Sequence, residues 1–154
     1  MKTVDVVILS DQNNLVEFNA SGDKCLGYLE DHILKEALED EGLSVAHLSW
    51  DDPNFDWSGA KALIFRSTWD YFYRIDEFSA WLQTVSKQTT LINSESLIYC
   101  NLDKHYLKDL QLKGVHIAES YFIEKDSNTS LKQLHLKLGW EETVLMPILT
   151  PMMS

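Results

Sequence analysis

The densest group of chemistry-bearing side chains in this 154-residue chain is the run Arg66-Ser67-Thr68-Trp69-Asp70-Tyr71. An arginine can hold a carboxylate through two parallel hydrogen bonds, hydroxyl groups add donors, and aromatic rings can wall a pocket. The run follows a short apolar segment, so we expect it where a strand ends. It predicts a binding site for a small carboxylate or amino acid. The alternative is that Asp70 caps the next helix while the aromatic rings pack against that helix.

Two further groups have simpler interpretations. Composition alone makes Asp103 the N-cap of a helix and Lys104 a solvated lysine beside it. The segment Trp50-Asp51-Asp52-Pro53, with Trp57 nearby, is interpreted as a structured turn, because proline fixes φ and aspartate can bond its own backbone.

Other site classes lack their motifs. The segment Ser10–Asn14 has neither GxGxxG nor GxxxxGK[ST], so a phosphate loop is not predicted there. The five histidines show no HxH or HExxH spacing, and each is interpreted as an isolated surface or edge residue. No serine lies in GxSxG. We therefore predict no metal site and name no catalytic residue.

The composition makes some classes of binding partner unexpected. The formal charge of -11 repels phosphate backbones and anionic lipids, so nucleic acid and membrane surfaces are not expected partners. Two cysteines without CxxC spacing fit a reducing compartment. Apolar runs are far shorter than the roughly 18 residues that span a bilayer, and the N-terminus has no signal-peptide pattern. We expect a cytoplasmic protein with one principal domain.

Strands and helices alternate through the first 114 residues. Apolar β-branched runs predict strands over 4–9, 44–48, 62–65 and 89–92. A helix over 28–41 is expected to bury Leu26, Leu29, Ile33, Leu34, Ala37 and Leu38, with Gly42 as a left-handed C-cap. Further helices are predicted over 75–85 and from Asp103 to Gly114, with one helical turn at 96–99.

This alternation predicts an α/β protein with a Rossmann-like parallel sheet covered on both faces, whose ligands gather beyond the carboxyl ends of the strands. After Gly114 the pattern changes to a strand over 120–123, a helix over 131–138 and a strand over 143–146. We interpret residues 115–154 as the start of a second, incomplete α+β unit.

Several motifs, taken in order, carry a family resemblance. They are Trp50-Asp51-Asp52 with Asp56-Trp57, Arg66–Tyr71, Phe78 with Trp81-Leu82, Asn93, Asn101–Leu107, Gly114-Val115, and Gly139-Trp140 with Val144–Pro147. Over about residues 25–148 the chain resembles the N-terminal part of an ATP-grasp superfamily ligase, in the glutathione-synthetase-like or cycloserine-ligase-like branch.

The resemblance implies a pre-ATP-grasp domain over residues 1–114 and the start of the ATP-grasp lobe over 115–154. Such ligases use ATP and Mg to activate a carboxylate as an acyl phosphate, which an amine then attacks. Lys104 matches the first of two lysines that approach the nucleotide phosphates, and Arg66–Tyr71 lie where this domain contributes to the substrate pocket. Met146 stands where the second lysine is usual. Losing one charge-assisted hydrogen bond costs roughly 1.5–3 kcal/mol, or about one to two orders of magnitude in affinity.

The first hypothesis is an N-terminal fragment of an ATP-dependent ligase, shortened by a gene break, a frameshift or a cloning boundary, that binds neither ATP nor Mg tightly and is inactive alone. The second is a free-standing small-molecule-binding or protein-interaction module, with a homodimer left open. The third, a dinucleotide-binding protein, rests on fold analogy alone.

Overall fold

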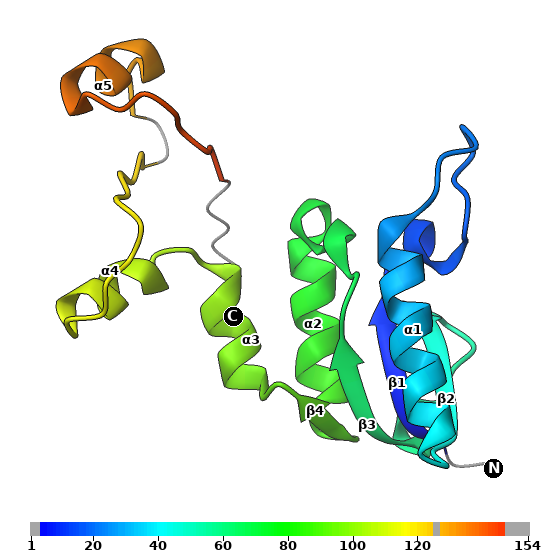
Figure 1. The fold of residues 1–154 in the computed structure, drawn as a ribbon. Helices are drawn as coiled ribbons and strands as arrows, with labels where there is room; N and C mark the ends of the chain where they lie inside the picture. Colours follow the sequence, from blue (N-terminus) through cyan, green and yellow to red (C-terminus); the bar gives the residue numbers. More distant parts are fainter. Residues whose placement is uncertain (1–3, 125–126, 147–154) are drawn as a thin grey trace.

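The computed structural model describes residues 4–124 and 127–146, and Figure 1 shows its elements in chain order. The strands are β1 (Val4–Ser10), β2 (Val45–Ser49), β3 (Ala60–Phe65) and β4 (Thr90–Ile92). The α-helices are α1 (Leu26–Asp40), α2 (Ile75–Val85), α3 (Glu95–Leu102), α4 (Tyr106–Leu112) and α5 (Leu131–Leu138). Short 3-10 helices are η1 (Gln12–Leu15), η2 (Trp57–Gly59) and η3 (Trp69–Tyr73).

The four strands form one parallel sheet in the order β2-β1-β3-β4, which confirms the predicted α/β fold with a Rossmann-like parallel sheet. β1 is paired on both sides, and consecutive residues from Val6 to Ser10 are buried, so its side chains are covered on both faces of the sheet. This explains the continuous apolar run Val6–Leu9, which is typical of a central parallel strand.

The two faces of the sheet differ in chemistry. Alternate β1 residues Val7 and Leu9 join a core with Leu63 of β3 and with Phe78 and Leu82 of α2. On the opposite face, Ser10 reaches Asp31 of α1. The α2 face is therefore an apolar core, whereas the α1 face becomes polar toward the carboxyl end of the sheet.

Aromatic rings fill the α2 face beyond β2. Trp50 is buried, and its ring centroid lies 5.2 Å from that of Phe78 and 5.6 Å from that of Trp81. Trp57 packs edge-on against Trp81 at 5.5 Å. We call Trp50, Trp57 and Trp81 the tryptophan cluster.

Helix α1 begins and ends close to the predicted positions, and Gly42 has the expected left-handed φ of 83°. Its expected buried face is wrong in part, because Leu26 is 69% exposed and Ile33 is 66% exposed. The fully buried positions are Gly27 and Asp31. The buried face of α1 is centred on these residues because Gly27 permits close approach to Asn14 and Ser67 and because hydrogen-bond donors surround Asp31.

The region after α2 departs further from expectation. α3 is a full eight-residue helix and not a single turn, and its Tyr99 hydroxyl donates to the Ser79 carbonyl of α2. The residue directly before α4 is His105 and not Asp103, although the Asp103 carboxylate accepts from the backbone N–H of His105 in the turn that leads into the helix. Gly114 ends this region with a left-handed φ of 81°.

The helix predicted over 131–138 is confirmed as α5, but the strands predicted over 120–123 and 143–146 are wrong. Both segments lack the ladder that defines a strand, since no strand of the described part of the chain runs beside them. In Figure 1, α4 and α5 project away from the sheet. The sequence also predicts poor packing for residues 146–154, all of which except Met146 lie outside the described residues.

None of the helices within residues 4–124 and 127–146 combines the length and the apolar character that crossing a membrane requires.

Candidate functional site

β1 and β3 are neighbours in the sheet, and the connections that follow them run in opposite directions across it. β1 leads through α1 to β2 on one side, and β3 leads through α2 to β4 on the other. The two loops are joined there, because Arg66 N–H donates to Leu9 O at 3.1 Å and Asp11 N–H donates to Ser67 O at 2.8 Å. In parallel sheets such a switch point is where ligands bind.

The run Arg66–Tyr71 starts at this switch point and then divides between the two faces. Arg66 and Ser67 turn toward α1, Thr68 is buried, and Trp69 at the start of η3 is 53% exposed. Asp70 and Tyr71 turn toward α2 and the aromatic core. The structure therefore does not bring all of these side chains to one surface.

Arg66 has the half-exposed guanidinium expected of a ligand-binding residue. Its Nε donates to Asp31 Oδ1 at 3.1 Å, and its Nη2 donates to Glu30 Oε2 at 3.3 Å. Its Nη1 has no partner among the described residues. The arginine side chain is 39% exposed, so part of its donor fork faces solvent beside the switch point.

Asp31 lies at the centre of a polar group with Ser10, His47 and Arg66, which we call the Asp31 cluster. No role for Asp31 was predicted from the sequence. Its side chain is fully buried, and its Oδ2 accepts from Ser10 Oγ at 2.8 Å. Burial alone would raise the pKa of Asp31, but hydrogen bonds from His47, Ser10, Ser67 and Arg66 outweigh burial and lower that pKa below its ordinary value. Asp31 therefore stays a carboxylate inside the protein.

His47 corrects the expectation that every histidine is isolated. It lies on β2 with its side chain 9% exposed, and its Nε2 is 2.6 Å from Ser10 Oγ and 3.5 Å from Asp31 Oδ2. The pairing of Ile8 with His47 puts His47 on the same face as Ser10. The period of two could have grouped these residues, but only with the strand register already known.

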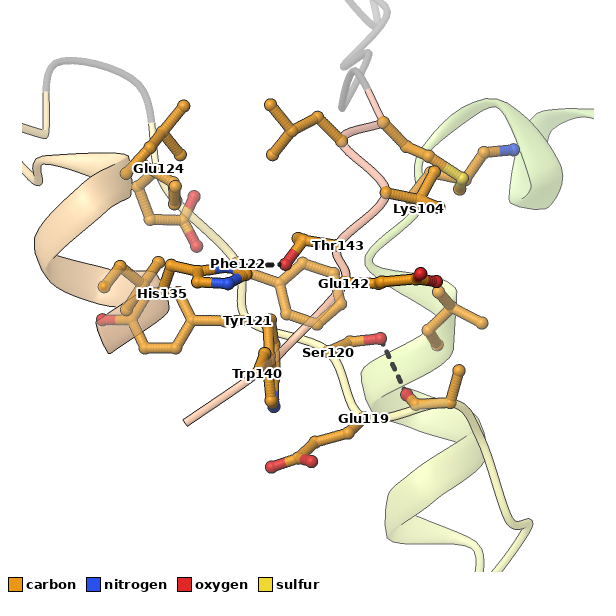
Figure 2. A pocket seen from close by; sticks show the side chains of 18 of the residues that line it. Lys104, Glu119, Ser120, Tyr121, Phe122, Glu124, His135, Trp140, Glu142 and Thr143 are labelled. Carbon is orange, nitrogen blue, oxygen red and sulfur yellow. Dashed lines mark hydrogen bonds between the residues drawn. The ribbon is translucent and has the colours of Figure 1, made fainter. Parts of the chain in front are cut away.

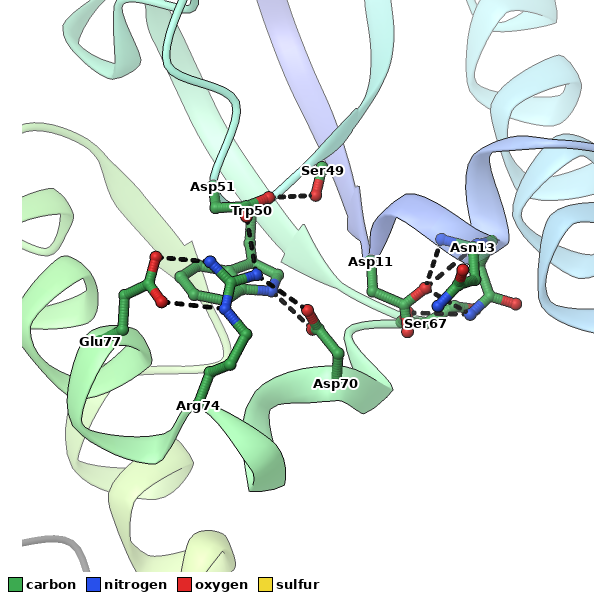
Figure 3. Close-up of polar contacts among 10 residues, drawn as sticks. Asp11, Asn13, Ser49, Trp50, Asp51, Ser67, Asp70, Arg74 and Glu77 are labelled. Carbon is green, nitrogen blue, oxygen red and sulfur yellow. Dashed lines mark hydrogen bonds and ion pairs between the residues drawn. The ribbon is translucent and has the colours of Figure 1, made fainter.

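Hydrogen bonds to Asp11 order the loop after β1 (Figure 3). Asp11 Oδ1 accepts from the backbone N–H groups of Asn13 and Asn14, at 2.9 and 3.1 Å, and so caps η1. Asn14 and Ser67 then lie against Gly27 of α1: a Cβ at position 27 would be 2.7 Å from Ser67 Oγ and closer still to Asn14 Oδ1. Glycine is required because the loop and the helix touch here.

Asp70 belongs to a separate ion-pair network on the α2 side (Figure 3). Its Oδ1 accepts from Trp50 Nε1 at 2.8 Å, and its Oδ2 accepts from Arg74 Nη1 at 3.0 Å. Arg74 also pairs with Asp51 and Glu77, and its guanidinium lies 4.6 Å from the centre of the Trp50 ring. Hydrogen bonds that Arg74 donates to Glu77 and Asp51 raise the Arg74 pKa. Both Asp70 oxygens are thus already engaged within the protein.

Tyr71 also contributes to packing. Its ring lies 5.4 Å from that of Phe78, and burial raises the pKa of its hydroxyl. The aromatic part of the alternative interpretation, rings packed against the next helix, therefore describes Tyr71, whereas Trp69 remains exposed.

Lys104 lies on a different part of the molecule. It lines a cavity of about 1030 Å³ whose other walls come from α4, residues 118–124, α5 and residues 140–146 (Figure 2). Its Nζ donates to the Asn101 carbonyl at 2.7 Å. No hydrogen bond or ion pair joins Lys104 to residues 66–71 in the described part of the chain. The structure thus places the two predicted site groups apart.

The cavity walls are held by a few polar contacts. His135 Nδ1 lies 2.9 Å from Thr143 Oγ1, as Figure 2 shows, and the His105 ring stacks on Phe122 at 5.2 Å. The Trp140 Nε1–H is buried and has no hydrogen-bond partner among the residues described.

Comparisons with known proteins point in one direction. Residues 6–93 match the family described as "D-cycloserine synthetase DcsG, N-terminal domain". The cycloserine biosynthesis protein DcsG of Streptomyces lavendulae is 36% identical over 95 residues, which cover 62% of this chain and 32% of that protein. The crystal structure of D-cycloserine synthetase DcsG matches with a TM-score of 0.62 at 31% identity, covering 73% of this chain and 34% of that one.

The family match covers one of the two predicted site groups and not the other. The chain spans about a third of the length of the relatives it matches. Residues 66–71 and the Asp31 cluster lie within the stretch that the family model covers, whereas Lys104 lies beyond it.

Proposed function

The chain belongs to the family of D-cycloserine synthetase DcsG N-terminal domains, and from this membership we propose that it is the N-terminal part of an ATP-dependent carboxylate–amine ligase. In this proposal the segment Arg66–Tyr71 contributes part of the pocket for a carboxylate or amino-acid substrate. Lys104 contributes one phosphate-facing cation, and the chain has no ligase turnover by itself.

The observation that carries the substrate proposal is the state of Arg66. Its guanidinium donates through Nε to the fully buried Asp31 carboxylate. The arginine side chain is partly exposed, and Nη1 has no partner among the described residues. A planar donor fork in this state suits two parallel hydrogen bonds to a carboxylate. Its place at the switch point of the sheet adds an independent reason to expect a ligand.

Calorimetric titration of the purified chain with a panel of amino acids and their hydroxy-acid and amide analogues tests this proposal. We expect at least one carboxylate to bind, and we expect Arg66→Ala to weaken that binding by roughly ten- to hundredfold, because a charge-assisted hydrogen bond is lost. Lys87→Ala is the matched control, since Lys87 is an exposed cation after α2. Binding that Arg66→Ala leaves unchanged would place the substrate elsewhere.

The described residues around Lys104 do not by themselves fit a nucleoside triphosphate, so the proposed role of Lys104 depends on cations from the remainder of such a ligase. The cavity is lined by two lysines, Lys104 and Lys132, but also by three glutamates, Glu119, Glu124 and Glu142. The lining therefore carries more negative than positive charge, and Lys104 already donates to a backbone carbonyl. We derive no step through ATP or Mg from these residues.

We predict accordingly that the purified chain hydrolyses ATP at the background rate in the presence of Mg²⁺. The physical reason is that too few cations face the phosphates to neutralise them. Phosphate release measured with and without the chain checks this, and Lys104→Ala should show the same background. Turnover that depends on Lys104 would overturn the prediction.

A free-standing binding module is the second candidate, and one observation favours it. Arg66 and its partner Asp31, together with Ser10 and His47 that adjoin Asp31, all lie within residues 6–93. Mixing the chain with a polypeptide that carries the remainder of Streptomyces lavendulae DcsG separates the two candidates. ATP hydrolysis that requires both polypeptides supports the ligase part, whereas retained amino-acid binding without such hydrolysis supports the module.

A further inference from the structure

We propose that His47, Ser10 and Asp31 form a buried hydrogen-bond relay that fixes the orientation of the Arg66 guanidinium, which makes Asp31 a positioning residue for ligand binding. The relay itself follows from the geometry of the α1 face. Its consequence for a carboxylate ligand rests on the function proposed above.

The relay is a continuous line of short contacts. His47 Nε2 lies 2.6 Å from Ser10 Oγ, Ser10 Oγ lies 2.8 Å from Asp31 Oδ2, and Asp31 Oδ1 accepts from Arg66 Nε at 3.1 Å. Ser10 and Asp31 are fully buried. Only the two ends, His47 and Arg66, have any exposed surface.

The donors and acceptors available in the relay determine which atom carries each hydrogen. An ionised carboxylate can only accept, so the single hydroxyl hydrogen of Ser10 must go to Asp31. Ser10 Oγ then has only lone pairs to offer to His47, and the short contact requires a hydrogen on His47 Nε2. The structure thereby assigns a hydrogen to Nε2 of His47. The lowered pKa of Asp31 is consistent with the ionised state assumed here.

The relay determines which way Arg66 points. Because the guanidinium is planar, a bond at Nε fixes the plane of the whole donor fork. Glu30 also holds Nη2, but its side chain is 67% exposed and can leave at little cost. Asp31 is therefore the fixed anchor, and an oriented arginine loses less rotamer freedom when a ligand binds.

Nuclear magnetic resonance on the intact, isotope-labelled chain tests the relay directly. The chain has two arginines, Arg66 and Arg74, and so gives two Nε–H signals, which Arg74→Lys assigns. We expect Asp31→Asn to shift the Arg66 signal and speed its exchange with water. Glu77→Gln is the matched control, because Glu77 accepts from Arg74 Nε and should move only the Arg74 signal.

The histidine end has its own readout. We expect the ring nitrogens of His47 to show a hydrogen on Nε2, and we expect Ser10→Ala to alter both the His47 and the Arg66 signals. If Asp31→Asn does not fold, Ser10→Ala and the unmodified chain still decide the matter. A bare His47 Nε2, or an Arg66 signal that both variants leave unmoved, overturns the relay.

Ligand binding separates positioning from a merely structural role. In a folded Asp31→Asn variant that retains Arg66, we expect affinity for the carboxylate ligand to fall roughly three- to tenfold, because the guanidinium must be ordered on binding. Equal affinity would refute positioning while leaving the function of Arg66 intact. If the unmodified chain binds no carboxylate, the proposed function fails and the resonance measurements still judge the relay.

Discussion

Two acidic residues contact Arg66, and they differ in their exposure. Asp31 is fully buried and anchors Nε, whereas Glu30 is largely exposed and occupies Nη2. A ligand carboxylate approaching the open edge of the guanidinium would compete with Glu30 and not with Asp31.

We therefore predict that Glu30→Gln raises the affinity for the carboxylate ligand by up to about fivefold, which corresponds to the free energy of an exposed ion pair. Calorimetry measures this change. Glu36→Gln is the matched control, because Glu36 is an exposed glutamate on the same helix that pairs with His32. Weaker binding in Glu30→Gln would mean that Glu30 itself contacts the ligand.

The buried carboxylate also predicts a pH dependence. The Asp31 pKa is lowered in the folded state from the ordinary value of 3.8. Its contribution to stability is therefore present above that value and lost as the pH falls through the lower folded pKa.

We expect the free energy of unfolding to decline as the pH drops below about 4, and we expect this decline to be shallower in Asp31→Asn. Urea denaturation followed by circular dichroism between pH 2.5 and pH 7, roughly the interval in which carboxylates titrate, measures both slopes. Asp40→Asn removes an exposed carboxylate from the same helix and should retain the full slope.

Gly27 gives a prediction based on contact distance. An added Cβ would press on Asn14 and Ser67, which are both buried. We expect Gly27→Ala to destabilise the protein by roughly 1–3 kcal/mol through overpacking, although alanine is the better helix former by about 1 kcal/mol. Gly59→Ala is the control, since a Cβ there meets nothing within 4 Å. Thermal unfolding compares the two variants.

At the scale of elements, the sequence predicted the existence of helices better than their orientation. The spacing of Leu29, Leu34 and Leu38 indicated α1 and its length, but the same pattern also included Leu26 and Ile33, which are exposed. The face that meets the sheet is centred on Gly27 and Asp31. A hydrophobic pattern cannot identify such a face, because an aspartate is buried only where donors from distant strands surround it.

The segments 119–124 and 141–146 show a second limit of local pattern. Their β-branched and aromatic residues favour extended backbone, and the backbone is indeed non-helical there. A strand also needs a neighbour to accept and donate its backbone hydrogen bonds. That requirement depends on the tertiary fold and not on the residues themselves.

We predict that amide protons of residues 119–124 and 141–146 exchange with solvent much faster than those of β1 and β3, because backbone groups outside a ladder exchange without any unfolding. Hydrogen exchange followed by mass spectrometry on the intact chain measures this. The helix α5 between these segments is an internal reference with its own hydrogen bonds. Protection equal to that of β1 would show that the two segments are paired in solution.

At the scale of the whole molecule, the parallel sheet could be predicted, and the site only in part. Alternating strands and helices require crossover connections, which led to the parallel sheet. The run at Arg66 was correctly placed at a strand end, but its residues point to two faces of the sheet. Ser10, Asp31 and His47 were missed because they come from two strands and a helix that only the folded chain brings together.

The tryptophan cluster leads to a practical consequence. Three of the five tryptophans pack against one another or a shared neighbour in the apolar core, and Trp140 lines the distant cavity. Trp69, three positions after Arg66, is the half-exposed indole at the switch point. A molecule that binds Arg66 and removes water from Trp69 would shift the fluorescence of this indole to shorter wavelength, while the emission of the tryptophan cluster stays constant.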